Sequence, residues 1–172
     1  MIILEDTRQQ NEKHYLKHKW FAENGIEIRR SKLWIGDYTL PANQSICIDT
    51  KKDIQELIGD ICGKQHDRFR AELIRAQETG IKLYILVENK GGEIGKTGIM
   101  NPTIRRLEDL HSWKNPRLFI RRNGKQLYPT ATKGITLQKA CYTMQRKYSV
   151  EFIFCTPEES GAKIVELLTK GE

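Results

Sequence analysis

The sequence predicts an α/β protein whose central mixed sheet is flanked by helices. Lys82–Val87 is the strongest candidate for a buried strand. Ser45–Lys51 alternates, with Ile46 and Ile48 on one face, which is typical of a strand that contacts the core on one side. Segments with helical spacing lie between the strand candidates, and this interleaving favours an α/β sandwich over a bundle or an all-β fold. A length of 172 residues suits one compact domain, residues 1–172.

The first half of the chain contains strand and helix candidates in turn. Strands are expected at Ile2–Leu4, Ile26–Ile28, Leu33–Ile35 and Ser45–Lys51. Helices are expected at Gln10–Asn24, after Asp53 up to about Cys62, and at His66–Thr79. Gly25 and Gly80 follow two of these helices as stop signals. Asp53 is expected to cap the helix that runs to about Cys62.

Residues 89–135 are expected to be a loop-and-hairpin insertion in this fold. Residues 89–112 are rich in glycine and polar groups, which predicts a mobile loop with one short helix. Arg117–Tyr128 is predicted to form a hairpin, because Asn123-Gly124 is the preferred pair for a type I′ turn.

After this insertion the chain is predicted to finish with a helix, a strand and a second helix. The first helix spans about Thr136–Tyr148, and the strand spans Val150–Cys155. The last helix is expected to begin with Thr156 as its N-cap and Pro157 at the first position, while Glu159 completes a capping box.

Composition and charge narrow the class of protein. The net charge of +7, from 29 basic and 22 acidic residues, favours a polyanion such as DNA, because lysine and arginine neutralise phosphates. The cysteines lack the spacing of a zinc knuckle, and Cys47, Cys141 and Cys155 are expected to be reduced core residues. No stretch is long enough to span a membrane and the N-terminus does not resemble a signal peptide, so a cytoplasmic protein without a membrane partner is expected.

Three acids at predicted strand ends or turns form the candidate site. They are Asp6, Asp37 and Asp49, and Lys51 follows two residues after Asp49. Because side chains alternate along a strand, Asp49 and Lys51 share a face, whereas Thr50 points the other way. Carboxylates suit a hard cation such as Mg²⁺, and a nearby lysine can hold an attacking water or stabilise charge on a phosphate. The pattern is compatible with a phosphodiesterase centre and, taken alone, also with a turn residue and a solvated ion pair.

The residues around these acids resemble a known nuclease family. The order Gly36-Asp37-Tyr38, Ile48-Asp49-Thr50-Lys51 and Leu57-Ile58-Gly59 is similar to the G-D-Y, V-E-R-K and D-L-I-G signature of the XPF/Mus81-type structure-specific endonucleases. That family belongs to the PD-(D/E)XK, restriction-endonuclease-like superfamily. The opening Glu5–Gln9 resembles the family's D-x-R-E, and Phe152–Cys155 with Ile164–Leu168 resembles its last strand and helix. The resemblance covers about residues 2–88 and 136–170.

The resemblance implies a restriction-endonuclease-like fold and a metal-dependent DNA endonuclease of DNA repair or recombination. Asp37 and Asp49 would bind Mg²⁺ or Mn²⁺ directly, Asp6 would complete the site or act through water, and Lys51 would position the attacking water. Branched or flap-like DNA is the implied substrate, and a homodimer or a partner subunit is implied because the family works as pairs of subunits. No counterpart of the family's helix-hairpin-helix tail is expected, and the compact form suits a bacterial or phage protein.

Departures from the family pattern leave alternatives open. The family's arginine is Thr50 here, and the glutamate of its D-x-R-E is Gln9. One extra residue before Leu57 would make Lys52 the catalytic lysine and would place Thr50 at the acid position, although strand alternation favours Lys51. The alternative function is a non-catalytic DNA-binding or scaffolding module on the same fold.

Other polar residues are candidates for binding. Contacts with DNA phosphates are expected from Arg8, Lys52, Arg68, Arg121 and Arg122, with Arg117 and Lys125 on the predicted hairpin as further candidates. Gly91–Thr97 resembles a P-loop, but the required first glycine falls on Lys90, so no nucleotide cofactor is expected. His14 and His18 have the spacing of a helical metal pair, but neighbouring lysines favour a solvated face, and no acid is expected to face them.

Overall fold

The core of the protein is a six-stranded mixed sheet. The computed structural model describes residues 1–9 and 15–170. In the sheet the strands follow the order β10-β5-β4-β3-β1-β2, and only β3 runs antiparallel to its neighbours. The bounds are β1 (Ile2–Asp6), β2 (Glu27–Ser31), β3 (Tyr38–Thr39), β4 (Ile46–Lys51), β5 (Lys82–Glu88) and β10 (Glu151–Cys155). The predicted central mixed sheet is confirmed.

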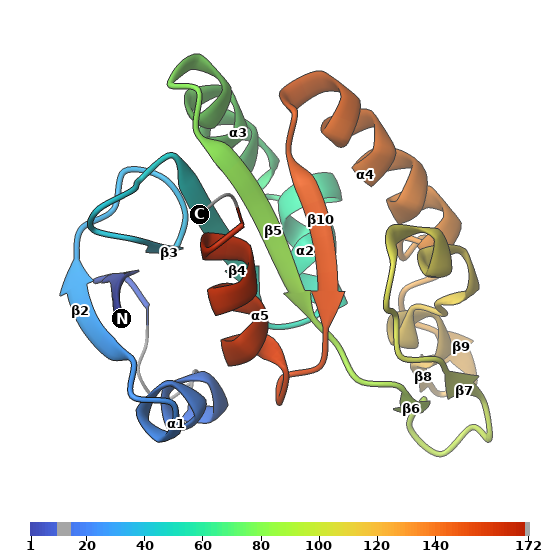
Figure 1. Cartoon of the computed structure of the whole chain (residues 1–172). Helices are drawn as coiled ribbons and strands as arrows, with labels where there is room; N and C mark the ends of the chain where they lie inside the picture. Colours follow the sequence, from blue (N-terminus) through green and yellow to red (C-terminus); the bar gives the residue numbers. More distant parts are fainter. Residues whose placement is uncertain (10–14, 171–172) are drawn as a thin grey trace.

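Helices cover both faces of this sheet (Figure 1). The helices α1 (Tyr15–Glu23) and α5 (Ser160–Leu168) lie on one face. The other face is covered by α2 (Ile54–Cys62), α3 (His66–Glu78) and α4 (Gly134–Tyr148). The fold class predicted from the interleaved strand and helix signals is therefore confirmed.

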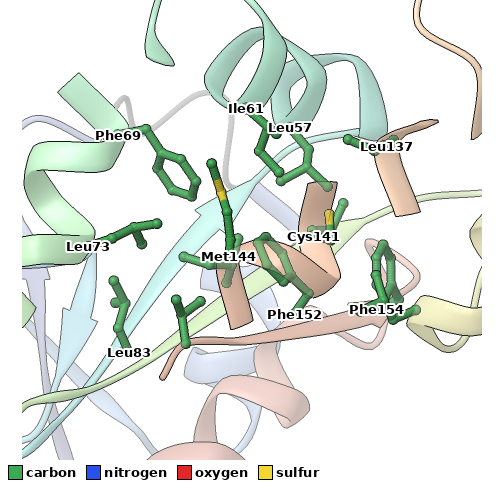
Figure 2. Packing of buried hydrophobic residues seen from close by; sticks show 14 of the residues in the cluster. Leu57, Ile61, Phe69, Leu73, Leu83, Leu137, Cys141, Met144, Phe152 and Phe154 are labelled. Carbon is green, nitrogen blue, oxygen red and sulfur yellow. The ribbon is translucent and has the colours of Figure 1, made fainter. Parts of the chain in front are cut away.

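Strand alternation divides the buried residues into two apolar clusters. Figure 2 shows the larger cluster, in which Leu57, Phe69 and Leu137 of the helices meet Leu83 and Phe152 of the sheet. The smaller cluster lies under α1 and α5 and contains Ile3, Phe21, Tyr38, Ile48 and Ile164. Burial of each large apolar side chain contributes about 1.5–3 kcal/mol. Because the two faces of β4 are both buried, its register is strongly specified.

One local prediction is confirmed and two are wrong. The Asp53 carboxylate accepts a 2.7 Å hydrogen bond from Glu56 N and caps α2 as expected. The predicted strand at 33–35 is instead a series of bends, because Leu33 N donates to Asp6 Oδ2 and Gly36 has a φ of +68°. The helix predicted from Thr156 begins at Ser160, and only half of the capping box forms, from Thr156 N to the Glu159 carboxylate.

The inserted segment (89–133) is more ordered than the sequence suggested. It contains β6 (Gly92–Glu93), β7 (Met100–Asn101), η2 (Leu107–Ser112), η3 (Pro116–Phe119), β8 (Arg121–Arg122) and β9 (Lys125–Gln126). Four of its apolar residues are buried in the larger cluster: Ile104, Leu107, Leu110 and Trp113. The short helix expected within residues 89–112 is confirmed as η2, whereas the expected loop around it is corrected to a layer packed beside α4. The hairpin is confirmed at its turn, where Arg122 pairs with Lys125 and both turn residues have positive φ, but it spans only 121–126, because residues 116–119 form η3.

Other predictions from the sequence have mixed outcomes. Cys47, Cys141 and Cys155 are buried and free, as expected. His14 lies outside the described residues, whereas His18 Nε2 lies 2.7 Å from Glu5 Oε1, so the expectation that no acid faces this pair is wrong. Among the residues that the structure describes, no helix is both long and apolar enough to cross a membrane.

Candidate active site

A cleft of about 660 Å³ opens where the end of β4 meets α2 and α3. The acids that line it are Asp37, Asp49, Asp53, Glu56, Asp60 and Glu72. The basic side chains that line it are Arg8, Lys51, Lys52, Arg68 and Arg117. The structure thus brings together two of the three predicted acids, Asp37 and Asp49, with both candidate lysines.

Asp37 is held between β1 and β4 by its own backbone. Asp37 N donates a 2.7 Å hydrogen bond to Ile48 O, and Asp6 N donates to Asp37 O at 2.8 Å. This approach requires Gly36, since a Cβ atom there would lie 2.8 Å from Ile48 O. The Asp37 carboxylate accepts hydrogen bonds from Thr50 N and Thr50 Oγ1, both at Oδ2. Oδ1 is left as the oxygen that can hold a ligand.

Asp49 and Lys51 lie on the same face of β4, as the alternation predicted. Lys51 Nζ lies 2.6 Å from Asp49 Oδ2 and 2.8 Å from Asp60 Oδ2. It also lies 5.1 Å from the centre of the Phe69 ring, a cation–π contact. Both side chains of the pair are buried, with 9% of Lys51 and 8% of Asp49 exposed. The ammonium group of Lys51 is therefore held in the cleft by two carboxylates and an aromatic ring.

The pKa values of this pair are set by burial, by the attraction between its members and by three neighbouring acids. Burial raises the pKa of Asp49 well above its ordinary value, Asp37 and Glu72 raise it further, and Lys51 opposes them. Burial alone would lower the pKa of Lys51, but the attraction of Asp49 and Asp60 raises it above its ordinary value. Lys51 therefore stays charged, and further positive charge beside Asp49 would stabilise its carboxylate form.

The donor set fits a hard divalent cation that keeps most of its waters. Asp49 Oδ2 is buried and receives no well-aligned hydrogen bond from the described residues, although Lys51 Nζ lies close to it. Within residues 1–9 and 15–170, no three His, Cys, Asp or Glu side chains form a ready-made metal cluster. Mg²⁺ is commonly bound through only one or two carboxylates together with waters and substrate phosphate. Asp37 and Asp49, which both line the cleft, are the candidate carboxylates for such an ion.

Asp6 occupies a different position from the one that the sequence suggested. It is fully buried and is not among the residues that line the cleft. Its Oδ1 accepts from Arg8 N and Arg8 Nε, and its Oδ2 accepts from Arg8 Nη2 and Leu33 N. Burial would raise the pKa of Asp6, but these hydrogen bonds outweigh it and lower the pKa below the ordinary value. The placement does not support a ligand role: Asp6 instead fixes Arg8 at the rim of the cleft.

The predicted phosphate contacts divide between the cleft and the hairpin. Arg8, Lys52 and Arg68 line the cleft, whereas Arg121 and Arg122 lie exposed on β8, outside it. Lys52 is exposed, and among the described residues its bonded group is the backbone N, which donates to Glu56 Oε2 at 2.8 Å. The lysine that contacts Asp49 is therefore Lys51, in agreement with the alternation.

Two acids of the cleft that contact neighbouring site residues were missed from the sequence. Glu72 on α3 accepts a 2.8 Å hydrogen bond from Gly36 N, and Asp60 on α2 binds Lys51. Helical spacing could have revealed both, because Asp60 is four residues after Glu56 and Glu72 is four residues after Arg68. Arg117 was expected on the predicted hairpin, but it lies on η3, and its place in the cleft depends on how the inserted segment folds back.

Comparison with known proteins supports the resemblance seen in the sequence. XPF from Aeropyrum pernix has a similar structure, with a TM-score of 0.59 and 15% identity over 98% of this chain and 63% of that chain. The same protein in complex with DNA gives a TM-score of 0.59 and 15% identity over 97% of this chain and 62% of that chain.

These matches at low identity establish a shared fold, and this chain spans less than two thirds of either neighbour's length. No match is found among curated proteins. The model of the ERCC4 domain family, however, matches residues 6–168, nearly the whole chain. The chain therefore belongs to the ERCC4 domain family.

Proposed function

We propose that this domain is a DNA endonuclease that hydrolyses phosphodiester bonds with Mg²⁺ or Mn²⁺ in the cleft. The observation that carries the proposal is the buried Asp49 Oδ2, which lies beside Lys51 but receives no well-aligned hydrogen bond. Asp37 and Asp49 would hold the metal ion. When bound, the ion supplies Lewis-acid chemistry, which neutralises phosphate charge and makes water a better nucleophile.

Lys51 acts as a donor in this scheme and not as the base. Its raised pKa keeps the ammonium protonated at neutral pH, so it can donate hydrogen bonds to the attacking water or to a phosphate oxygen. Asp60 and Phe69 hold it in place, and this preorganisation avoids the cost of reorientation during the reaction. Arg8, Lys52 and Arg68 would bind flanking phosphates at the rim.

The proposed substrate is branched or flap-like DNA. It rests on the XPF-type signature in the sequence, and a structural neighbour, XPF from Aeropyrum pernix, is in complex with DNA. The same resemblance leads us to propose that the domain works in a pair, with a second copy or a partner subunit.

A second candidate is a DNA-binding or scaffolding module without catalysis. The ion pairs of Lys51 with Asp49 and Asp60 favour it, because such pairs can be purely structural. Thr50 and Gln9 also favour this candidate, because the family signature has arginine and glutamate at these positions.

Cleavage of labelled flap, fork, four-way and duplex DNA in Mg²⁺, Mn²⁺ or EDTA tests these candidates. We expect metal-dependent cutting that falls at least about 100-fold in Asp49→Ala and Lys51→Ala, the usual loss for a group at the reacting centre. Asp67→Ala, an exposed acid outside the cleft, is the control and should cut like the wild type. A loss in Lys51→Ala at least tenfold greater than in Lys52→Ala identifies Lys51 as the catalytic lysine.

Calorimetric titration with Mn²⁺ provides a readout other than activity. Binding should weaken in Asp49→Ala and stay unchanged in Asp67→Ala. Wild-type cleavage in Asp49→Ala would refute the site. Binding of DNA without any cutting under all metal conditions would establish the scaffold instead.

A further inference from the structure

We infer that the inserted segment completes the cleft, and that its Arg117 binds a backbone phosphate of the DNA strand that enters there. The inference rests on the proposed function and extends it to a segment without a place in the sequence resemblance. Among the described residues, Arg117 is the only member of residues 89–133 that lines the cleft. It is exposed, so it is available to a ligand.

The charges in the cleft explain why a phosphate would need Arg117. The floor contains Asp37, Asp49, Asp60 and Glu72, which repel an incoming backbone. The charge of two basic side chains of the cleft is partly offset by ion pairs, since Arg8 binds Asp6 and Lys51 binds Asp49 and Asp60.

Three basic side chains of the cleft remain: Lys52, Arg68 and Arg117. None of them forms an ion pair with another described residue, in contrast to Arg8 and Lys51. Lys52 follows β4 and Arg68 belongs to α3, whereas Arg117 comes from the inserted segment. A DNA strand bound in the cleft would therefore contact unpaired positive charge from three separate parts of the chain.

A buried side chain fixes the backbone of Arg117 against α2. Asn115 is 1% exposed and precedes η3. Its Oδ1 accepts from Gln55 Nε2 at 2.6 Å and from Arg117 N at 3.0 Å, while its Nδ2 donates to Thr132 O at 2.8 Å. Gln55 itself lines the cleft. The bridge therefore sets where Arg117 enters the cleft wall.

The guanidinium of Arg117 is also preorganised for phosphate. Its Cζ lies 5.8 Å from the centre of the Tyr128 ring, which is a cation–π contact with an exposed aromatic side chain. The planar guanidinium group can donate in the bidentate geometry that suits phosphate oxygens. Arg121 and Arg122 are also exposed, on β8 of the hairpin.

DNA binding in EDTA isolates this interaction from cleavage. Anisotropy of a labelled flap DNA is measured against the full chain over a range of salt concentrations for Arg117→Ala, Arg117→Lys and Arg146→Ala. Arg146 is the matched control, an exposed arginine of α4 outside the cleft. Thermal melts of each variant check the fold.

Arg117→Ala should weaken binding about eightfold at 0.1 M salt and reduce the salt slope by about 0.9, the effect of one lost phosphate contact. Arg117→Lys should keep the salt slope and lose part of the affinity, and Arg146→Ala should bind like the wild type. An unchanged slope and affinity in Arg117→Ala would overturn the inference, even if the wild type cuts DNA. Weaker binding in Arg117→Ala would uphold it, even if the wild type cuts nothing.

Discussion

Gly36 is the residue whose replacement tests most directly how the cleft is built. It has a φ of +68°, and an added Cβ would lie 2.8 Å from Ile48 O and 3.1 Å from the Ile48 carbonyl carbon. Gly80, at the end of α3, has nearly the same φ, +69°, but nothing lies within 4 Å of its Cβ position. Gly36→Ala and Gly80→Ala therefore share the backbone strain and differ in the clash with β4.

The structure gives the magnitude of each change. The left-handed conformation costs an alanine about 1–2 kcal/mol at either position. The close contact at Gly36 adds about 1–3 kcal/mol, the usual cost of excess volume in a packed interior. For a domain of this size, 1 kcal/mol lowers the melting temperature by about 2–4 °C. Gly36→Ala should thus melt roughly 2–12 °C below Gly80→Ala.

The functional effect should exceed the loss of stability. Relief of the clash requires Asp37 to move away from Ile48, which breaks its 2.7 Å backbone hydrogen bond to β4. Below the melting transition, Gly36→Ala should therefore bind Mn²⁺ weakly and cut slowly, whereas Gly80→Ala should resemble the wild type. Thermal melts, Mn²⁺ titration and cleavage of flap DNA measure all three properties. Equal melting temperatures and equal cleavage in the two variants would refute the reasoning.

Two further predictions concern acids near the cleft. Asp6→Asn should lower the free energy of unfolding by about 2 kcal/mol at pH 7, because Arg8 and Leu33 lose a charged acceptor. The pKa of Asp6 lies below 3.8 in the folded chain, so this deficit should shrink as the pH falls through that pKa; a constant deficit in urea unfolding would contradict it. Glu72→Gln removes a charge that raises the pKa of Asp49 and keeps an acceptor for Gly36 N. The acidic limb of the cleavage pH profile should move to lower pH, and an unchanged limb would exclude this coupling.

The positions of Asp49 and Lys51 could be predicted because they depend on one local rule. Side chains alternate along any strand, and Ile46, Cys47 and Ile48 fixed which face of β4 each residue occupies. Asp53 was equally predictable, since an N-cap acts on the backbone three residues away.

The role of Asp6 could not be predicted because it depends on segments distant in sequence. Its carboxylate meets Leu33 N only because residues 33–35 bend instead of forming the expected strand. The inserted segment was misjudged for a similar reason. Its glycines and polar residues suggested a loop. Leu107 and Leu110, however, stabilise the segment only when α4 and the sheet are in place to bury them.

Asn115 couples local unfolding of the inserted segment to the shape of the cleft. Its partners belong to α2, to η3 and to the chain before α4, so local unfolding of the segment would also release the Gln55 side chain. A ligand that binds only the folded form of the segment stabilises that form by RT ln(1 + [L]/Kd), about 2.7 kcal/mol when the ligand concentration is 100 times Kd. A DNA strand bound by Arg117 would therefore suppress the local unfolding of the inserted segment, which contributes Arg117 to the cleft wall. By thermodynamic linkage, any change that destabilises the folded form of the segment would weaken DNA binding, even if it alters no phosphate contact.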